Sequence, residues 1–149
     1  MVVSLNNKLT YEELLKEKSS FIIPITGTSM LPLLDNTLDT VEIIKINKDL
    51  KKGDVILYKR YDNTYILHRI IKIKKHYYLL SGDNQYLTEK VKKSQIIGIM
   101  NGYFKNETYI SVNDKEYLKY SKHIMHTRIF RKIRHHISKI YHKIFKKDR

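Results

Sequence analysis

Short apolar runs, each closed by turn residues after a few positions, constrain the fold of this chain more than any other feature. Many are rich in β-branched residues, and they follow one another closely: residues 21–25, 41–46, 55–58, 65–73, 77–80, 96–100 and 108–112. Turn residues separate several of them, as in Lys51-Lys52-Gly53-Asp54 and Asp62-Asn63. Segments this short and this closely spaced predict antiparallel strands. We therefore expect a mostly β fold, as a small antiparallel barrel-like or sandwich-like domain.

The two ends of the chain carry helical patterns instead. Thr10 and Glu13 form a capping box, which predicts a short helix with Leu14 and Leu15 facing inward. Near the other end, isoleucine recurs in steps of three or four, at Ile129, Ile133, Ile137, Ile140 and Ile144. At about 100° per residue these positions share one helical face. With basic residues on the opposite side, the pattern predicts a basic amphipathic helix.

Positive charge is concentrated in this C-terminal segment. The 149 residues carry a formal net charge of +14, and residues 117–149 hold 11 Lys or Arg against a single acid, Asp148. We therefore divide the chain into a body, residues 1–115, and a basic helical tail, residues 116–149. A tail of this charge predicts a polyanionic surface as its partner.

Several classes of protein are excluded by composition. The chain has no Cys, which excludes disulfides, thiol catalysis and Cys-based zinc sites. Its apolar runs are far shorter than the roughly 20 residues that a transmembrane helix needs. The N-terminal residues do not have the pattern of a secretory signal. Five of the seven His lie in the tail without a nearby acidic cluster, so we expect neither a metal nor a cofactor.

Two residues are candidates for nucleophilic chemistry. Ser29 lies between Gly27 and Pro32, in irregular backbone that can expose its hydroxyl and leave its N–H for an oxyanion. His68 lies in an apolar strand and could accept the serine proton. The alternatives are an ordinary turn around the serine and a strand histidine bonded to a backbone carbonyl.

Two carboxylates could orient the imidazole. Asp83 lies in the turn Ser81-Gly82-Asp83-Asn84 at a strand end, where a carboxylate can point inward. The same residues are common in plain hairpin turns, which is the alternative interpretation. Glu89 is the second candidate.

In this order along the chain, four motifs resemble those of the type I signal peptidase superfamily, whose members include self-cleaving SOS-type repressors. The likeness is to the nucleophile box, the Gly-Asp-Val strand start, the general-base box of the endoplasmic-reticulum, archaeal and sporulation-type branch, and the acidic box. These are carried by Gly27-Thr28-Ser29-Met30-Leu31-Pro32, Gly53-Asp54-Val55-Ile56, His68-Arg69-Ile70 and Gly82-Asp83-Asn84. The resemblance covers about residues 21–98. It implies Ser29 as nucleophile and His68 as general base, where most bacterial members have Lys.

The sequence departs from the family pattern at the oxyanion site. Members usually carry a hydroxyl residue two positions before the nucleophile, and this chain has Gly27 there. Oxyanion stabilisation would then rest on the Ser29 N–H, with Thr28 or Thr26 as a helper. The family's usual membrane-spanning helix is also missing from this sequence.

The orienting carboxylate is left open by the resemblance. Members of the His branch carry an Asp six residues after the acidic box, and Glu89 aligns with that position. The better-defined turn slightly favours Asp83, so the predicted catalytic residues are Ser29, His68 and Asp83.

These features predict a serine endopeptidase that cleaves a signal or leader peptide from a peptide or preprotein substrate. The substrate would pair with residues 21–25. Residues 117–149 would bind an anionic membrane surface as a peripheral anchor, by default on the cytoplasmic face. Packing of the tail on the body is the alternative. Nucleic acid is less favoured, because phosphate binding needs no apolar stripe.

The rival interpretation is a catalytically degenerate module of the same fold that acts through its basic helix on a membrane or nucleic acid. A repressor-type relative is disfavoured, because only about 20 residues precede the predicted fold.

Overall fold

The computed structural model describes residues 2–3, 9–35 and 39–145. Its strands are β1 (Val2–Val3), β2 (Ser20–Pro24), β3 (Thr40–Ile44), β4 (Val55–Lys59), β5 (Tyr65–Ile73), β6 (Tyr77–Ser81), β7 (Glu89–Lys92), β8 (Ile96–Lys105) and β9 (Thr108–Ser111). The helices are α1 (Tyr11–Glu17), α2 (Lys115–Phe145) and a short 3-10 turn, η1 (Lys93–Gln95).

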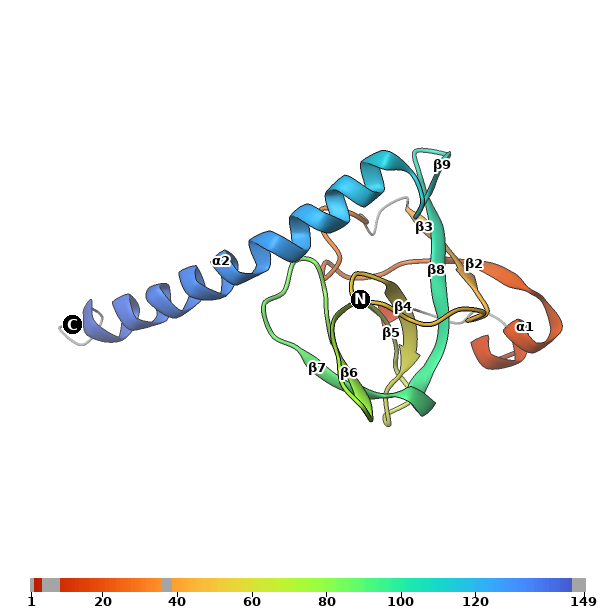
Figure 1. Cartoon of the computed structure of the whole chain (residues 1–149), viewed down its shortest axis with the longest axis horizontal. Helices are drawn as coiled ribbons and strands as arrows, with labels where there is room; N and C mark the ends of the chain where they lie inside the picture. Colours follow the sequence, from red (N-terminus) through yellow and green to blue (C-terminus); the bar gives the residue numbers. More distant parts are fainter. Residues whose placement is uncertain (1, 4–8, 36–38, 146–149) are drawn as a thin grey trace.

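All described strands belong to one antiparallel sheet (Figure 1). Their order is β2-β3-β8-β4-β5-β6-β7, with β1 beside β5 and β9 beside β8. The sheet is open, with β2 and β7 at the two ends of this order among the described strands. The predicted mostly β, antiparallel fold is confirmed.

The apolar runs predict most strands to within a few residues, and the turns between them explain why. Gly53 and Asn63 both have positive φ, at 98° and 67°, a conformation that Gly and Asn adopt at least cost. β1 and β7 were not predicted. β1 contains only Val2 and Val3, whereas β7, with the sequence Glu-Lys-Val-Lys, contains no apolar run and buries only Val91.

The capping box predicted at the N-terminal helix is present. The Thr10 hydroxyl accepts from the Glu13 N–H at 3.2 Å, and the Glu13 carboxylate accepts from the Thr10 N–H at 2.8 Å. Leu15 is buried and Leu14 packs at the core edge, so both face inward as expected.

Strand β4 lies in the middle of the sheet and is buried on both faces. Val55 and Leu57 enter one hydrophobic cluster, whereas Ile56 and Tyr58 enter the other. Successive strand residues point to opposite faces, so a continuous apolar run is what a strand covered on both sides requires. His68 of β5 pairs with Ile56, and it therefore shares the face of Tyr58.

Helix α2 starts well before the isoleucine stripe, and the burial of its apolar side chains differs between its two halves. Tyr117 and Ile124 are buried against the body, whereas Phe130, Ile133 and Ile137 are 72%, 50% and 61% exposed. The helix runs out from the sheet domain (Figure 1). No described helix is long and apolar enough to cross a membrane.

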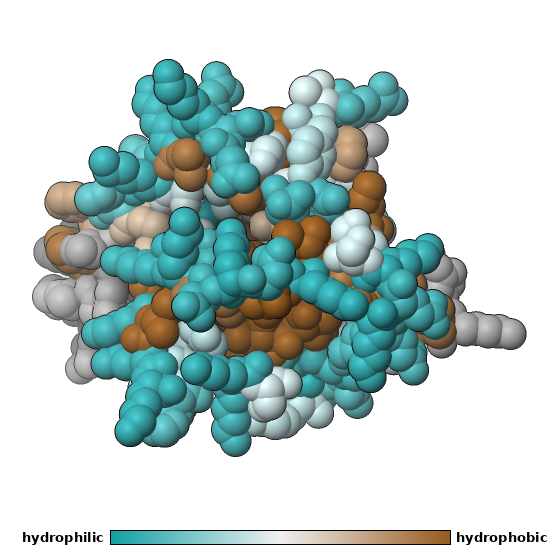
Figure 2. Space-filling model, turned by 45° about the vertical axis from the view of Figure 1, so that its right-hand side comes forward, coloured by the Kyte–Doolittle hydropathy of each residue, from teal (hydrophilic) through white to brown (hydrophobic). Residues whose placement is uncertain are grey.

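The surface is mainly hydrophilic, as the charge of the chain predicts. On the face seen in Figure 2, hydrophilic side chains surround a central apolar area. Lysine side chains can cover apolar surface with their methylene stems while the ammonium groups stay in water.

Candidate active site

Ser29 lies on the loop that follows β2. The next residue, Met30, is fully buried, and the Leu34 N–H donates to the Met30 carbonyl at 3.1 Å. Before the serine, Gly27 has φ 88°, and after Met30 the Leu31–Pro32 peptide bond is cis. Core packing on one side and a glycine turn on the other therefore hold the serine in irregular backbone, as the sequence indicated.

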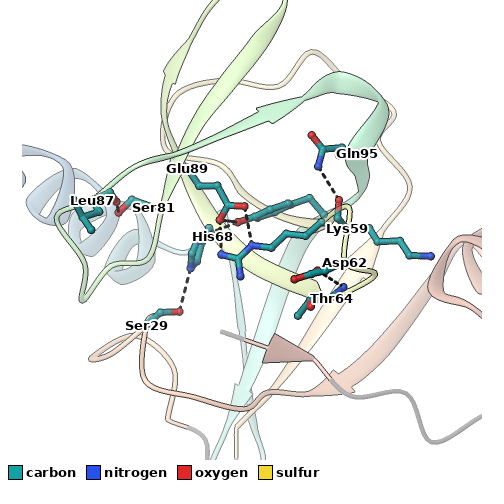
Figure 3. Close-up of polar contacts among 11 residues, drawn as sticks. Ser29, Lys59, Asp62, Thr64, His68, Ser81, Leu87, Glu89 and Gln95 are labelled. Carbon is teal, nitrogen blue, oxygen red and sulfur yellow. Dashed lines mark hydrogen bonds and ion pairs between the residues drawn. The ribbon is translucent and has the colours of Figure 1, made fainter.

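His68 meets Ser29 from the middle of β5. Its Nε2 lies 3.2 Å from the Ser29 Oγ, within hydrogen-bond distance. Both residues are nearly buried, with 7% of Ser29 and 4% of His68 exposed. Figure 3 shows the imidazole between Ser29 on one side and Glu89 on the other. The structure thus brings the two predicted residues together.

Tyr58 links the other imidazole nitrogen to Glu89. The Tyr58 hydroxyl donates to a Glu89 carboxylate oxygen at 2.7 Å and lies 3.3 Å from His68 Nδ1. Because its own proton goes to Glu89, the Tyr58 oxygen can only accept from His68. Nδ1 then carries the proton, and Nε2 is left as the acceptor facing Ser29.

Arg60 holds Glu89 in place from the solvent side. The guanidinium Nε donates to Oε1 at 2.7 Å, and a second nitrogen donates to Oε2 at 2.5 Å. Burial alone would raise the pKa of Glu89, but hydrogen bonds from Arg60 and Tyr58 outweigh it and lower the pKa. Glu89 is therefore a carboxylate at neutral pH.

The protonation state of His68 is set mainly by burial. Loss of solvent lowers its pKa from 6.5 to about 3, and the Glu89 charge opposes the shift without cancelling it. The imidazole is therefore neutral at physiological pH. A neutral ring is the form that can accept a proton from a hydroxyl.

Asp83 is engaged elsewhere, in a buried ion pair with Arg69. The Arg69 Nε and one terminal nitrogen donate to the two Asp83 oxygens, each at 2.7 Å, and the Tyr120 hydroxyl adds a bond of 3.0 Å. The other terminal nitrogen of Arg69 donates to the Gly53 carbonyl and to the hydroxyls of Tyr117 and Ser121. Asp83 is thus tied to α2.

The turn that carries Asp83 also supports the serine loop. The Asn84 N–H donates to the Ser29 carbonyl at 2.7 Å, and its side chain donates to the Thr28 carbonyl. A Cβ on Gly82 would lie 2.4 Å from the Ser29 carbonyl oxygen and 2.8 Å from the Ser29 Cβ. Only glycine allows this approach.

A cavity of about 400 Å³ opens beside His68. It is bounded by Arg60, Leu80 and Glu89, and by residues 84–88, which we call the pocket loop. This loop has no regular secondary structure, and it connects the turn at Gly82-Asp83 to Glu89.

Tyr58 and Arg60 are the site residues that sequence reasoning missed. Tyr58 could have been found from the predicted hairpin. Its turn at Asp62-Asn63 sets a register in which Ile56 pairs with His68. Tyr58, two residues further, is then the diagonal neighbour of His68 on the same face.

No group of three or more potential metal ligands converges within the part of the chain that the structure describes. The described site is built from hydroxyl, imidazole, carboxylate and guanidinium groups.

A buried hydroxyl–imidazole pair, held by a loop and a neighbouring strand of an antiparallel sheet, is the arrangement that nucleophilic chemistry by a serine requires. Residues 2–101 match the sequence profile of the Peptidase S24-like family, which is more than half of the chain, and the protein belongs to that family. Searches of curated proteins and of solved structures find no match. The superfamily predicted from the motifs is confirmed.

Proposed function

We propose that this protein is a serine endopeptidase in which Ser29 is the nucleophile and His68 the general base. The observation that carries the proposal is the 3.2 Å approach of His68 Nε2 to Ser29 Oγ in a nearly buried setting. Histidine in place of lysine at the base position resembles the branch found in endoplasmic-reticulum, archaeal and sporulation-type signal peptidases.

In the proposed reaction, the Ser29 Oγ attacks the peptide carbonyl carbon while Nε2 of His68 takes the hydroxyl proton. The tetrahedral oxyanion would be stabilised by the Ser29 N–H. The C–N bond then breaks as His68 returns the proton to the leaving amine. Water, deprotonated by the same nitrogen, attacks the acyl ester, and its proton is finally returned to the Ser29 oxygen.

We assign the orienting role to Glu89, acting through Tyr58, and a different role to Asp83. Glu89 and Tyr58 form the hydrogen-bond chain that reaches Nδ1 of His68. Such a chain would hold the tautomer and stabilise the imidazolium that forms. The Asp83 carboxylate binds Arg69, and the Gly82-Asp83-Asn84 turn abuts Ser29. Asp83 would therefore position the nucleophile.

We further propose that α2 binds an anionic membrane surface and brings the site to signal or leader peptides. Ile133 follows the buried Ile124 by nine residues, which is about two and a half helical turns. Ile133 and its exposed neighbours Phe130 and Ile137 therefore lie on the side opposite to the one packed on the body. This geometry disfavours packing of that stripe on the body itself, and a basic helix with an apolar stripe suits a lipid interface.

The test is cleavage of synthetic peptides that carry an apolar segment followed by small residues, with and without phosphatidylserine vesicles. We expect cutting after small residues, faster on vesicles, and none by Ser29→Ala. Cleavage that persists in Ser29→Ala would overturn the nucleophile assignment. Absence of cleavage across the peptide set would favour the degenerate binding module.

A further inference from the structure

The pocket loop is held by hydrogen bonds to neighbouring segments, and not by a helix or strand of its own. Residues 84–88 form neither helix nor strand, and Leu87 is exposed. From the inside, the Ser81 hydroxyl donates to the Leu87 carbonyl at 2.6 Å. From the outside, the loop is held by a residue of α2.

That residue is Arg128. Its guanidinium donates to the Tyr86 carbonyl at 2.6 Å and to the Gln85 carbonyl at 3.0 Å, with a longer contact of 3.4 Å to Leu87. Successive carbonyls of an extended strand point in opposite directions, so they cannot converge on one group. The guanidinium therefore stabilises one irregular conformation of the loop. Hydrogen bonds from a charged donor are stronger than those between neutral groups.

The helix register that delivers Arg128 is itself fixed. Tyr117 and Ser121, on the same side of α2, accept from the buried Arg69, and Ile124 packs against the body. Arg128 follows Ile124 by one helical turn. Among the described side chains, it is the most C-terminal one with a bond to the body, and the exposed Phe130 and Ile133 follow it.

We propose that Arg128 is a positioning residue that shapes the substrate pocket beside His68. By fixing the loop, α2 becomes part of the pocket wall, and substrate affinity depends on the helix as well as on the β body. The inference rests on the proposed peptidase function for its substrate, whereas the loop clamp itself rests on contacts alone.

The test compares Arg128→Ala with Lys119→Ala, which removes the same charge from an exposed position of α2. A peptidyl phosphonate with Ala at its P1 position serves as the probe, and inactivation kinetics separate KI from kinact. For Arg128→Ala we expect KI to rise about tenfold and kinact to fall by less than about threefold. Amide hydrogen exchange of residues 85–89 should accelerate in the same variant. Lys119→Ala should match wild type in both readouts.

Arg128→Lys tests whether the planar guanidinium, and not the positive charge alone, is needed to hold the loop. Lysine keeps the charge but cannot reproduce the fork, so we expect at most partial rescue. Full rescue by lysine, an unchanged KI in Arg128→Ala, or equal effects of Lys119→Ala would each overturn the proposal. If the wild type is not inactivated at all, the peptidase function fails and the pocket role fails with it. Loop exchange then decides separately whether the clamp exists.

Discussion

Two carboxylates flank the pocket loop in the sequence, Asp83 before it and Glu89 after it, and they have different partners. Asp83 is paired with the fully buried Arg69 and bonded to Tyr120 of α2. Glu89 is paired with the half-exposed Arg60 and bonded to Tyr58, which reaches the imidazole. A well-defined turn therefore does not decide which carboxylate serves the histidine, because the hydrogen-bond partners do. In the proposed mechanism, Asp83 positions the nucleophile and stabilises the fold, whereas Glu89 orients the base.

The largest expected effect comes from Asp83→Asn. Breaking one side of a buried ion pair leaves Arg69 uncompensated, which costs about 3–5 kcal/mol. We expect a loss of this size in the free energy of unfolding, measured by urea denaturation, together with loss of Ser29 reactivity. Arg69→Met with Asp83→Leu removes both charges and should be much less destabilising. A fully stable Asp83→Asn would contradict the comparison.

Glu89→Gln should lower activity while leaving stability nearly unchanged, in contrast to Asp83→Asn. Because Glu89 is partly exposed and acts on the base through Tyr58, we expect activity to fall about tenfold to a hundredfold. The unfolding midpoint should change little in comparison with Asp83→Asn. The measurement is the inactivation rate by a serine-directed probe beside a thermal melt. A variant with wild-type reactivity would remove Glu89 from the account.

Tyr58→Phe sharpens the same side of the comparison, because it removes only the hydroxyl between His68 and Glu89. We expect about a tenfold loss of reactivity, since Nδ1 loses its acceptor while the Arg60–Glu89 pair persists. The control is Tyr78→Phe, which removes the hydroxyl of another buried tyrosine in the same hydrophobic cluster as Tyr58. Equal effects in the two variants would point to packing and not to the hydrogen-bond chain.

The pH dependence tests whether the base is held neutral. Because burial lowers the pKa of His68 to about 3, reactivity at about pH 5.5 should stay close to that at neutral pH. The stability sign follows from linkage, since below about pH 6.5 the unfolded chain binds a proton that the folded chain does not. His68 should therefore make stability fall as pH decreases from 6.5 toward 3. That contribution should be absent in His68→Asn, which is compared by urea melts across this range.

The smallest effect on the site itself is expected from the exposed stripe of α2. Ile133→Ser with Ile137→Ser should weaken binding to phosphatidylserine vesicles about tenfold, because two apolar side chains lose their lipid contact. Reactivity of Ser29 in solution should remain at the wild-type level. Tyr61→Ser, another exposed apolar residue away from α2, is the matched control for vesicle sedimentation.

The parts of the structure that could be predicted are those written in local patterns. Apolar runs and turn residues indicated most strands, and the Thr10 capping box indicated α1. The motif resemblance predicted that Ser29 and His68 would meet. The partners of Asp83 and Glu89 could not be predicted, because they depend on sheet register and on the docking of a helix distant in sequence. Packing of the tail on the body was kept as an alternative, but the residues that pack, Tyr117 and Ile124, were not singled out because they are interspersed with polar residues.

The most direct test of the central claim is labelling of the purified protein by a fluorophosphonate, with the modified residue located by mass mapping. The account predicts labelling of Ser29 in the wild type and its loss in His68→Ala, because only the neutral imidazole activates the hydroxyl. Folding of the variant is checked by circular dichroism. A folded His68→Ala that is labelled as fast as wild type, or a wild type not labelled at Ser29, would contradict the account.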